Sequence, residues 1–484
     1  MTDENLSQSI QDPTDVAKKR ISGKLIGIIV GGIVTVLATV AVSFALFSGG
    51  GNQPEDVLPR DTVAMAKIDL NPKIGQRINL VRFLSKFPRT IQNFNEEDPV
   101  GSILEQSSVS SELDWDEIKP WIGNRYALAL VESAGNLNPV LAISIKDESE
   151  MKYFFKKNYP DLSITVILDY LLIAQDKSVL NVITSAPTHL SDNEDYKSDM
   201  NTLGGDQIAS VWVNLKPIIK LSDTLIYDYL YDQGLEQNYN TVQNTSGRIA
   251  IGMHFTPDTF VTDLITVDLA KDEIKVEQES KSLELLGDLP SDLLGVLSID
   301  GIGKALDDSL LSEPLVRDLL NNIGISSNDI SAIFEGSLAL LAVDGNRSSA
   351  DPLYLLRLAP TNPNLALNAL QRILSDNGFD PMEFDSIIRS DGEYIYLGAD
   401  SDSLNQGISA LKSGAAPLRD DEQFKKTLSE SGNLSLFVNL SRVLPKFDIN
   451  VSQAPLGALG ISIGADSKES GVSRTKITLS LKSD

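Results

Sequence analysis

A stretch of 23 residues near the N-terminus, 25–47, contains no charged residue and no Asn, Gln or Pro. At about 1.5 Å per helical residue it extends roughly 34 Å, enough to cross a hydrocarbon core of about 30 Å. Basic residues lie at positions 18–20 and 24, just before it. Because basic flanks stay in the cytoplasm, we expect one transmembrane helix with the N-terminus inside and residues 48–484 outside. A cleaved signal peptide is the competing interpretation, although its apolar region is normally shorter, about 7–15 residues.

One face of the predicted helix carries a small residue at every fourth position. This face includes Gly27, Gly31, Thr35 and Thr39. Such rows allow the backbones of membrane helices to approach closely, so these four residues form a candidate contact face for a homodimer or a partner helix. The alternative is that small residues are simply common in membrane spans.

The formal net charge is −26, and it is distributed unevenly. Residues 1–24 hold four acids and four bases, which cancel, and residues 25–54 hold no charge. The whole acidic excess therefore lies beyond the predicted span, where it opposes binding to nucleic acid and to anionic lipid head groups. The chain has no Cys, which excludes thiol nucleophiles, Cys-ligated zinc and iron–sulfur clusters.

The region after the span contains an internal repeat. The sequence LPRD at 58–61 returns as LPSD at 289–292, and SVWVNL at 210–215 returns as SLFVNL at 435–440. A middle block around 116–139 returns in the same order at 329–352, which indicates a tandem duplication. Trp212 and Phe437 stand at equivalent positions in apolar runs, so both are expected in the core. The predicted organisation is a disordered cytoplasmic tail (1–24), a transmembrane helix (25–47), a flexible tether (48–56), a first extracytoplasmic repeat (57–270), a linker (271–283) and a second extracytoplasmic repeat (284–484).

Each repeat combines short β-type runs with helical patterns. In the first repeat we predict helices at 73–87 and 149–158, and strands at 63–70, 126–132, 139–145, 170–174, 208–214, 248–255 and 260–269. In the second we predict a helix at 364–376, and strands at 294–299, 337–344, 353–358, 394–398, 434–439, 458–464 and 475–481. Strands joined mainly by hairpins predict an α+β fold: two tandem similar domains with antiparallel sheets and packed helices, preceded by one N-terminal transmembrane helix.

Three short motifs follow the span: LPRDT at 58–62, DLNP at 69–72 and FLSKFP at 83–88. In these motifs and in its organisation the chain resembles a family of bacterial single-pass membrane proteins whose domain has no assigned function. The resemblance implies a protein of the bacterial cell envelope, and it implies no catalytic residues.

Histidine chemistry is poorly supported. The chain has two His, and His254 is expected to share one face of its strand with Ala250 and Gly252, as a half-exposed side chain. His189 has no partner at a recognisable spacing, so neither a Ser-His-Asp triad nor a His-based metal site is predicted.

Acidic residues at equivalent repeat positions form the sharpest candidate carboxylate site. They are Asp61 and Asp69 in the first repeat and Asp292 and Asp300 in the second. We favour the simpler interpretation that these side chains cap turns and strand ends by local hydrogen bonds. No catalytic, metal-binding or cofactor-binding residue is predicted.

The leading functional hypothesis is a non-enzymatic, membrane-anchored binding or scaffolding protein of the bacterial envelope. One alternative is a carrier or sensor of an apolar, lipid-like ligand held between sheet and helices. Another is an extracytoplasmic hydrolase that uses paired carboxylates. The expected partners are the cell membrane and an envelope protein or lipid, with no nucleic acid.

Overall fold

The computed structural model describes residues 51–87, 115–204, 206–221, 246–268, 282–301, 303, 320, 324–345, 352–430, 432–447, 455–465 and 471–482. The predicted span 25–47, with its contact face of Gly27, Gly31, Thr35 and Thr39, lies outside these residues. No helix in the described part of the chain is long and apolar enough to cross a membrane.

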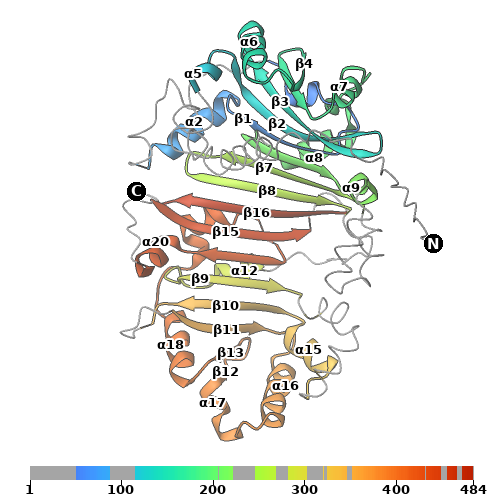
Figure 1. The fold of residues 1–484 in the computed structure, drawn as a ribbon. Helices are drawn as coiled ribbons and strands as arrows, with labels where there is room; N and C mark the ends of the chain where they lie inside the picture. Colours follow the sequence, from blue (N-terminus) through green and yellow to red (C-terminus); the bar gives the residue numbers. More distant parts are fainter. Residues whose placement is uncertain are drawn as a thin grey trace, which may run out of the picture.

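One antiparallel sheet runs through the molecule (Figure 1), and it contains all 16 described strands. The strands from the first half are β1 (Ala64–Asp69), β2 (Ile122–Ser133), β3 (Asn136–Ile145), β4 (Ser163–Ile167), β5 (Tyr170–Ala174), β6 (Ala209–Asn214), β7 (Arg248–Phe255) and β8 (Thr259–Val267). Those from the second half are β9 (Gly295–Asp300), β10 (Ser337–Val343), β11 (Leu353–Ala359), β12 (Ile388–Ser390), β13 (Ile395–Gly398), β14 (Leu434–Val438), β15 (Leu456–Ala465) and β16 (Val472–Leu481).

The two halves have the same strand order around a central pair. Outward from that pair the order is β8-β7-β6-β1-β2-β3-β5-β4 on one side and β16-β15-β14-β9-β10-β11-β13-β12 on the other. The predicted α+β class with antiparallel pairing is confirmed. The expectation of separate sheets is wrong, because β8 and β16 pair along their length, from Val267↔Val472 to Thr259↔Ser480. This pairing satisfies two strand edges that separate sheets would leave open.

Helices occupy equivalent places in the two halves. In the first half they are α2 (Ile74–Leu84), α5 (Trp115–Ile118), α6 (Glu148–Asn158), α7 (Lys177–Thr184), α8 (Glu194–Leu203) and α9 (Leu215–Leu221), with 3-10 turns η1 (Pro54–Asp56) and η3 (Leu190–Asp192). In the second half they are α12 (Ser282–Gly287), α15 (Ser327–Phe334), α16 (Pro363–Asp376), α17 (Phe384–Ile387), α18 (Ser401–Leu411), α19 (Glu422–Thr427) and α20 (Leu440–Val443), with η6 (Pro381–Glu383), η7 (Leu418–Asp420) and η8 (Leu444–Phe447).

Most of the hydrophobic core lies on one face of the sheet, which we call the helical face. The α7 and α8 helices pack on it in the first half, and α12, α18 and α19 in the second. Trp212 is 1% exposed and Phe437 0%, so their predicted core positions are confirmed. Each ring meets a ring from the covering helix at a steep angle, Tyr196 at 5.6 Å and Phe424 at 5.4 Å between centroids.

Part of the segment predicted as a flexible tether is folded. The backbone oxygen of Asn52 accepts hydrogen bonds from the Tyr170 hydroxyl at 3.0 Å and from Arg125 at 3.4 Å. Pro54 is buried at the start of η1, and the Gln53 N–H donates to the Asp56 carboxylate at 2.7 Å. The expectation is therefore wrong for residues 52–56, because these polar and apolar contacts fasten them to the sheet.

Candidate binding surface

The face of the sheet opposite the helical face, which we call the open face, carries apolar side chains across many strands. Side chains alternate between the two faces of a strand, so the strand registers identify which residues share a face. One cross-strand row from β2 to β11 comprises Leu128, Ala66, Val211, Ile251, Leu264, Thr475, Ile463, Leu434, Ile299, Leu338 and Leu358. The row two residues along comprises Tyr126, Ile68, Ala209, Met253, Thr262, Ile477, Ile461, Leu436, Leu297, Leu340 and Leu356.

Neither row contains a charged residue. At about 4.8 Å between neighbouring strands, ten steps correspond to roughly 48 Å measured along the sheet. Three of the side chains, Ile463, Ile477 and Leu340, are 37–39% exposed, although large aliphatic groups are usually buried. The open face is therefore an apolar surface with exposed aliphatic side chains on β15, β16 and β10, while Ile68, Ala209 and Leu358 in the same rows are at most 5% exposed.

Charged side chains that alternate with the two rows lie on the helical face, whereas Glu132, beyond the rows at the end of β2, is exposed on the open face. Arg248 shares that face with Ala250, and Asp263 with Ile265, because each pair is separated by two residues. On β16, Arg474 and Lys476 alternate with the apolar residues of the open face. Along the two rows, apolar side chains therefore lie on one face of the sheet and charged side chains on the other.

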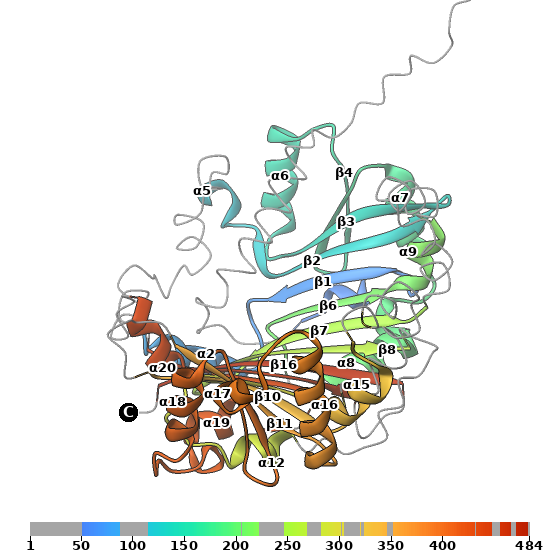
Figure 2. The ribbon, with the colours of Figure 1, turned by 90° about the horizontal axis from the view of Figure 1, so that it is seen from below.

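Helices bound the open face at its two ends (Figures 1 and 2). The α5 and α6 helices pack on Leu141 and Ile143 at one end, and α15 and α16 pack on Leu358 at the other. Between them, α2 packs on Phe255 and on the first residues of the second row, including Ile68 and Ala209, and so covers this part of the open face. In Figure 1 no described helix lies in front of the middle of β8, β16 and β15.

The candidate carboxylates do not converge. The Asp69 carboxylate accepts two hydrogen bonds. Its Oδ2 lies 3.1 Å from Arg125 Nε, and its Oδ1 lies 2.8 Å from the backbone nitrogen of Asn71. The predicted local bonding of Asp69 at the strand end is therefore confirmed. Asp61 precedes β1 and Asp69 ends it, so the strand separates them, and β9 with Asp300 lies seven strand positions from β1. A hydrolytic acid pair has no support in this geometry.

His254 lies on the helical face with Ala250 and Gly252, as predicted, and its side chain is 21% exposed. Its Nδ1 is 3.7 Å from Oδ2 of Asp263. Burial lowers the pKa of His254, against the charge of Asp263, and burial raises the pKa of Asp263, against the charge of Lys476. Both shifts favour neutral groups, which is the behaviour of a partly desolvated structural pair. No group of three metal-ligating side chains occurs in the described residues.

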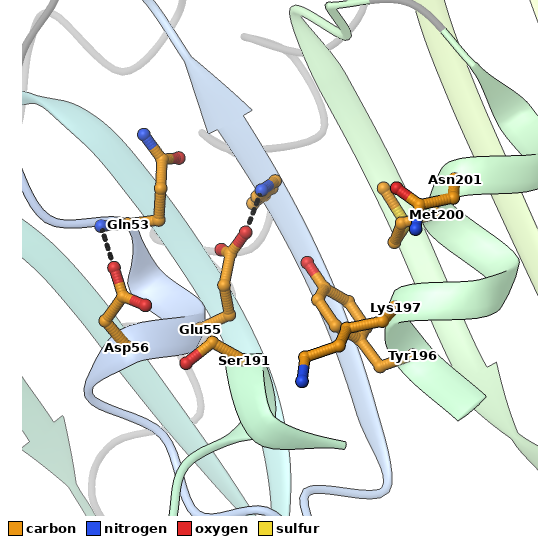
Figure 3. A pocket seen from close by; sticks show the side chains of 9 residues that line it. Gln53, Glu55, Asp56, Ser191, Tyr196, Lys197, Met200 and Asn201 are labelled. Carbon is orange, nitrogen blue, oxygen red and sulfur yellow. Dashed lines mark hydrogen bonds and ion pairs between the residues drawn. The ribbon is translucent and has the colours of Figure 1, made fainter. Parts of the chain in front are cut away.

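A pocket of about 260 Å³ lies between η1 and α8, over β1 (Figure 3). Lys67 Nζ contacts Glu55 Oε1 at 2.5 Å, and in Figure 3 the Tyr196 hydroxyl points toward this ion pair. Burial raises the pKa of Tyr196 above its ordinary value, and the charge of Glu55 adds to the effect. Asp56 and Lys197 also line the pocket, so its lining carries two acids and two bases.

The second half builds the same junction without these groups. At the repeat offset of 231, Glu55 corresponds to Leu286 and Lys67 to Ser298. Tyr196 corresponds to Phe424, since the N–H of each is capped by the side chain three residues earlier. The duplicated fold therefore does not require an ion pair and a phenol at this place.

Sequence reasoning assigned the apolar positions of single strands, such as Ile249, Ile251 and Met253 on one face of β7, but did not assemble them into a surface. The missing information was the pairing of β8 with β16, which joins the apolar positions of both halves. Apolar alternation within each strand was the signal available.

Comparisons with known proteins show no family. No family model matches the chain, and no solved structure matches it. The chain is 27% identical over 159 residues to copper-exporting P-type ATPases of Staphylococcus aureus strains USA300 / TCH1516 and USA300. This alignment covers 31% of the present chain and 19% of each ATPase, so the chain spans about a fifth of the length of the curated proteins it matches.

Proposed function

We propose that this chain is a non-enzymatic, membrane-anchored binding protein of the bacterial cell envelope whose ligand carries an acyl chain. The observation that carries the proposal is the open face, with two rows of eleven side chains that contain no charge. Exposed apolar side chains such as Ile463, Ile477 and Leu340 in these rows are typical of surfaces that bind apolar ligands, membranes or partner proteins. A hydrocarbon chain is the occupant that needs no polar partner along such a surface.

The predicted anchor supports a lipid as the source of that chain. The apolar stretch ends at residue 47 and the folded part begins at Asn52, whose side chain and backbone are both held. At about 3.5 Å per residue, the five steps from residue 47 to residue 52 reach roughly 18 Å at most. The folded part is therefore expected to lie close to the head groups, where acyl lipids are the most abundant apolar molecules.

The finer organisation is part of the same proposal. We infer two tandem, similar extracytoplasmic domains at 57–270 and 284–484 that share one sheet, and the repeated strand order supports this inference. The contact face of Gly27, Gly31, Thr35 and Thr39 would allow a homodimer through the anchor.

Copper export is not carried over from the ATPases. The alignment covers only 19% of their length, and the chain has no Cys to supply the thiolate ligands that Cu(I) favours.

The orientation can be tested with single cysteines, since the native chain has none. Ser413, which is exposed, and Ser7, in the predicted cytoplasmic tail, are each replaced by Cys in the full chain. In intact cells an impermeant maleimide is expected to label the Ser413→Cys chain and not the Ser7→Cys chain. The reverse labelling would overturn the proposed location.

Ligand chemistry can be tested by mass spectrometry of the full chain purified in mild detergent. We expect acyl lipids to be retained at close to one per chain, because the open face shields a hydrocarbon chain from water. A single-span membrane protein without a folded extracytoplasmic part, purified in parallel, is the control. Retention no greater than in that control would contradict the proposal.

A further inference from the structure

The two-residue turn between β4 and β5 is unusual in conformation and in exposure. Leu168 has a φ of 53°, in the left-handed region that a bulky residue rarely adopts. Its side chain is 63% exposed, so no burial within the described part of the chain compensates for the strained backbone. Short hairpin turns of this kind normally carry Gly, Asn or Asp.

The second half uses an ordinary residue at the same place. Tyr170 at the start of β5 corresponds to Tyr394, just before β13, so Leu168 corresponds to Gly392. Gly392 also has a positive φ, 101°, which glycine adopts without strain. The turn geometry is thus a requirement of the fold, and the exposed leucine is not.

The leucine turn is also the place where the N-terminal segment meets the folded part. The Asn52 side-chain amide donates to Asp169 Oδ1 at 2.9 Å, and the Tyr170 hydroxyl donates to the Asn52 backbone oxygen at 3.0 Å. Asp169 and Tyr170 directly follow Leu168. Since the predicted span ends at residue 47, Asn52, which contacts the leucine turn, lies within roughly 18 Å of the end of the anchor.

We propose that Leu168 enters the interfacial region of the bilayer beside the anchor and fixes the orientation of the folded part on the membrane. The proposal rests on the anchor of the proposed function. The partner is a phospholipid bilayer, because the short connection to the anchor holds this apolar tip at the membrane surface. Neighbouring Lys146 and Asp147 are exposed and of opposite charge, so the contact depends on the apolar side chain and not on lipid charge.

The test places a fluorophore at the tip. The full chain with Leu168→Cys, its single thiol labelled with an environment-sensitive nitrobenzoxadiazole dye, is reconstituted into phosphatidylcholine vesicles. The matched control is Ser390→Cys, an exposed position beside the equivalent turn of the second half. We expect a blue-shifted emission for the label at 168, and at least twofold stronger quenching by a lipid-borne nitroxide than for the label at 390.

Two results would overturn the proposal, and they are distinguishable. Equal quenching at 168 and 390, in vesicles from which alkaline carbonate does not extract the chain, would overturn the membrane contact of Leu168 alone. Extraction of the chain by carbonate would overturn the anchor, and with it both the proposed function and this contact.

Discussion

Replacing Asp199 by Ala is expected to lower the free energy of unfolding by about 3–5 kcal/mol, the usual cost of removing one partner of a buried ion pair. Asp199 is 2% exposed and lies on α8. Its Oδ2 accepts from Trp212 Nε1 at 2.8 Å and from Arg248 Nε at 2.6 Å, and its Oδ1 accepts from Arg248 at 3.1 Å. The substitution leaves a buried indole N–H and a guanidinium without these acceptors, so α8 loses its buried polar attachment to β6 and β7 and keeps the exposed contact of Asp195 with Arg248.

Asp195→Ala is the matched control for this prediction. Asp195 lies on the same helix and contacts the same guanidinium at 3.4 Å, but its side chain is 59% exposed. Exposed pairs contribute about 0–1 kcal/mol, so the control should unfold close to the native chain. Urea unfolding of the full chain in detergent, monitored by tryptophan fluorescence, measures the free energy of unfolding of both variants. Similar losses for the two variants would show that the buried network contributes little.

Replacing Ile477 by Glu is expected to reduce retained acyl lipid at least tenfold. Ile477 lies near the middle of the open face on β16, and its side chain is 38% exposed. A carboxylate there places a charge against the ligand, and burying an unpaired charge is strongly unfavourable. Because the position is partly exposed, the carboxylate can remain hydrated in the free protein, and we expect the fold to persist. Mass spectrometry of co-purified lipid gives the measurement.

Met382→Glu is the control for the apolar face. Met382 is 89% exposed in η6, so the substitution adds the same charge without touching the two apolar rows. If Ile477→Glu retained as much lipid as Met382→Glu, with both variants folded, the open face would not be the binding surface.

Local patterns predicted most strands and the helices α2, α6 and α16, but not α8 or α18, although α18 is as long as α2 and α6. The predicted strand 248–255 coincides with β7, and the predicted helix 73–87 contains α2. Apolar alternation and hairpin turns carry this information within a few residues of the chain. Short β4 and β12 were missed, since five and three residues give little periodicity.

The candidate surface was less predictable, because it depends on contacts distant in sequence. Val211 and Leu434 lie in one row only because β8 pairs with β16, and nothing local to either strand encodes that pairing. The fastening of Asn52 to Tyr170 also joins residues far apart in the chain. The repeat indicated two similar units, but it did not indicate which strand edges of the two units pair, because that pairing is a tertiary contact.

The pairing of β8 with β16 also constrains the order in which the chain can be completed. During synthesis, β8 emerges about two hundred residues before β16, so its outer edge has no hydrogen-bonding partner in the finished pairing until the second half is made. Closing so long a loop is slow, and an unpaired edge is prone to associate with other chains. A chain truncated before residue 471 would lack β16 and keep the edges of both β8 and β15 open. Assembly of the sheet is therefore complete only when the last dozen described residues have folded. Until then, the edges of β8 and β15 have unpaired backbone groups that can associate with other chains.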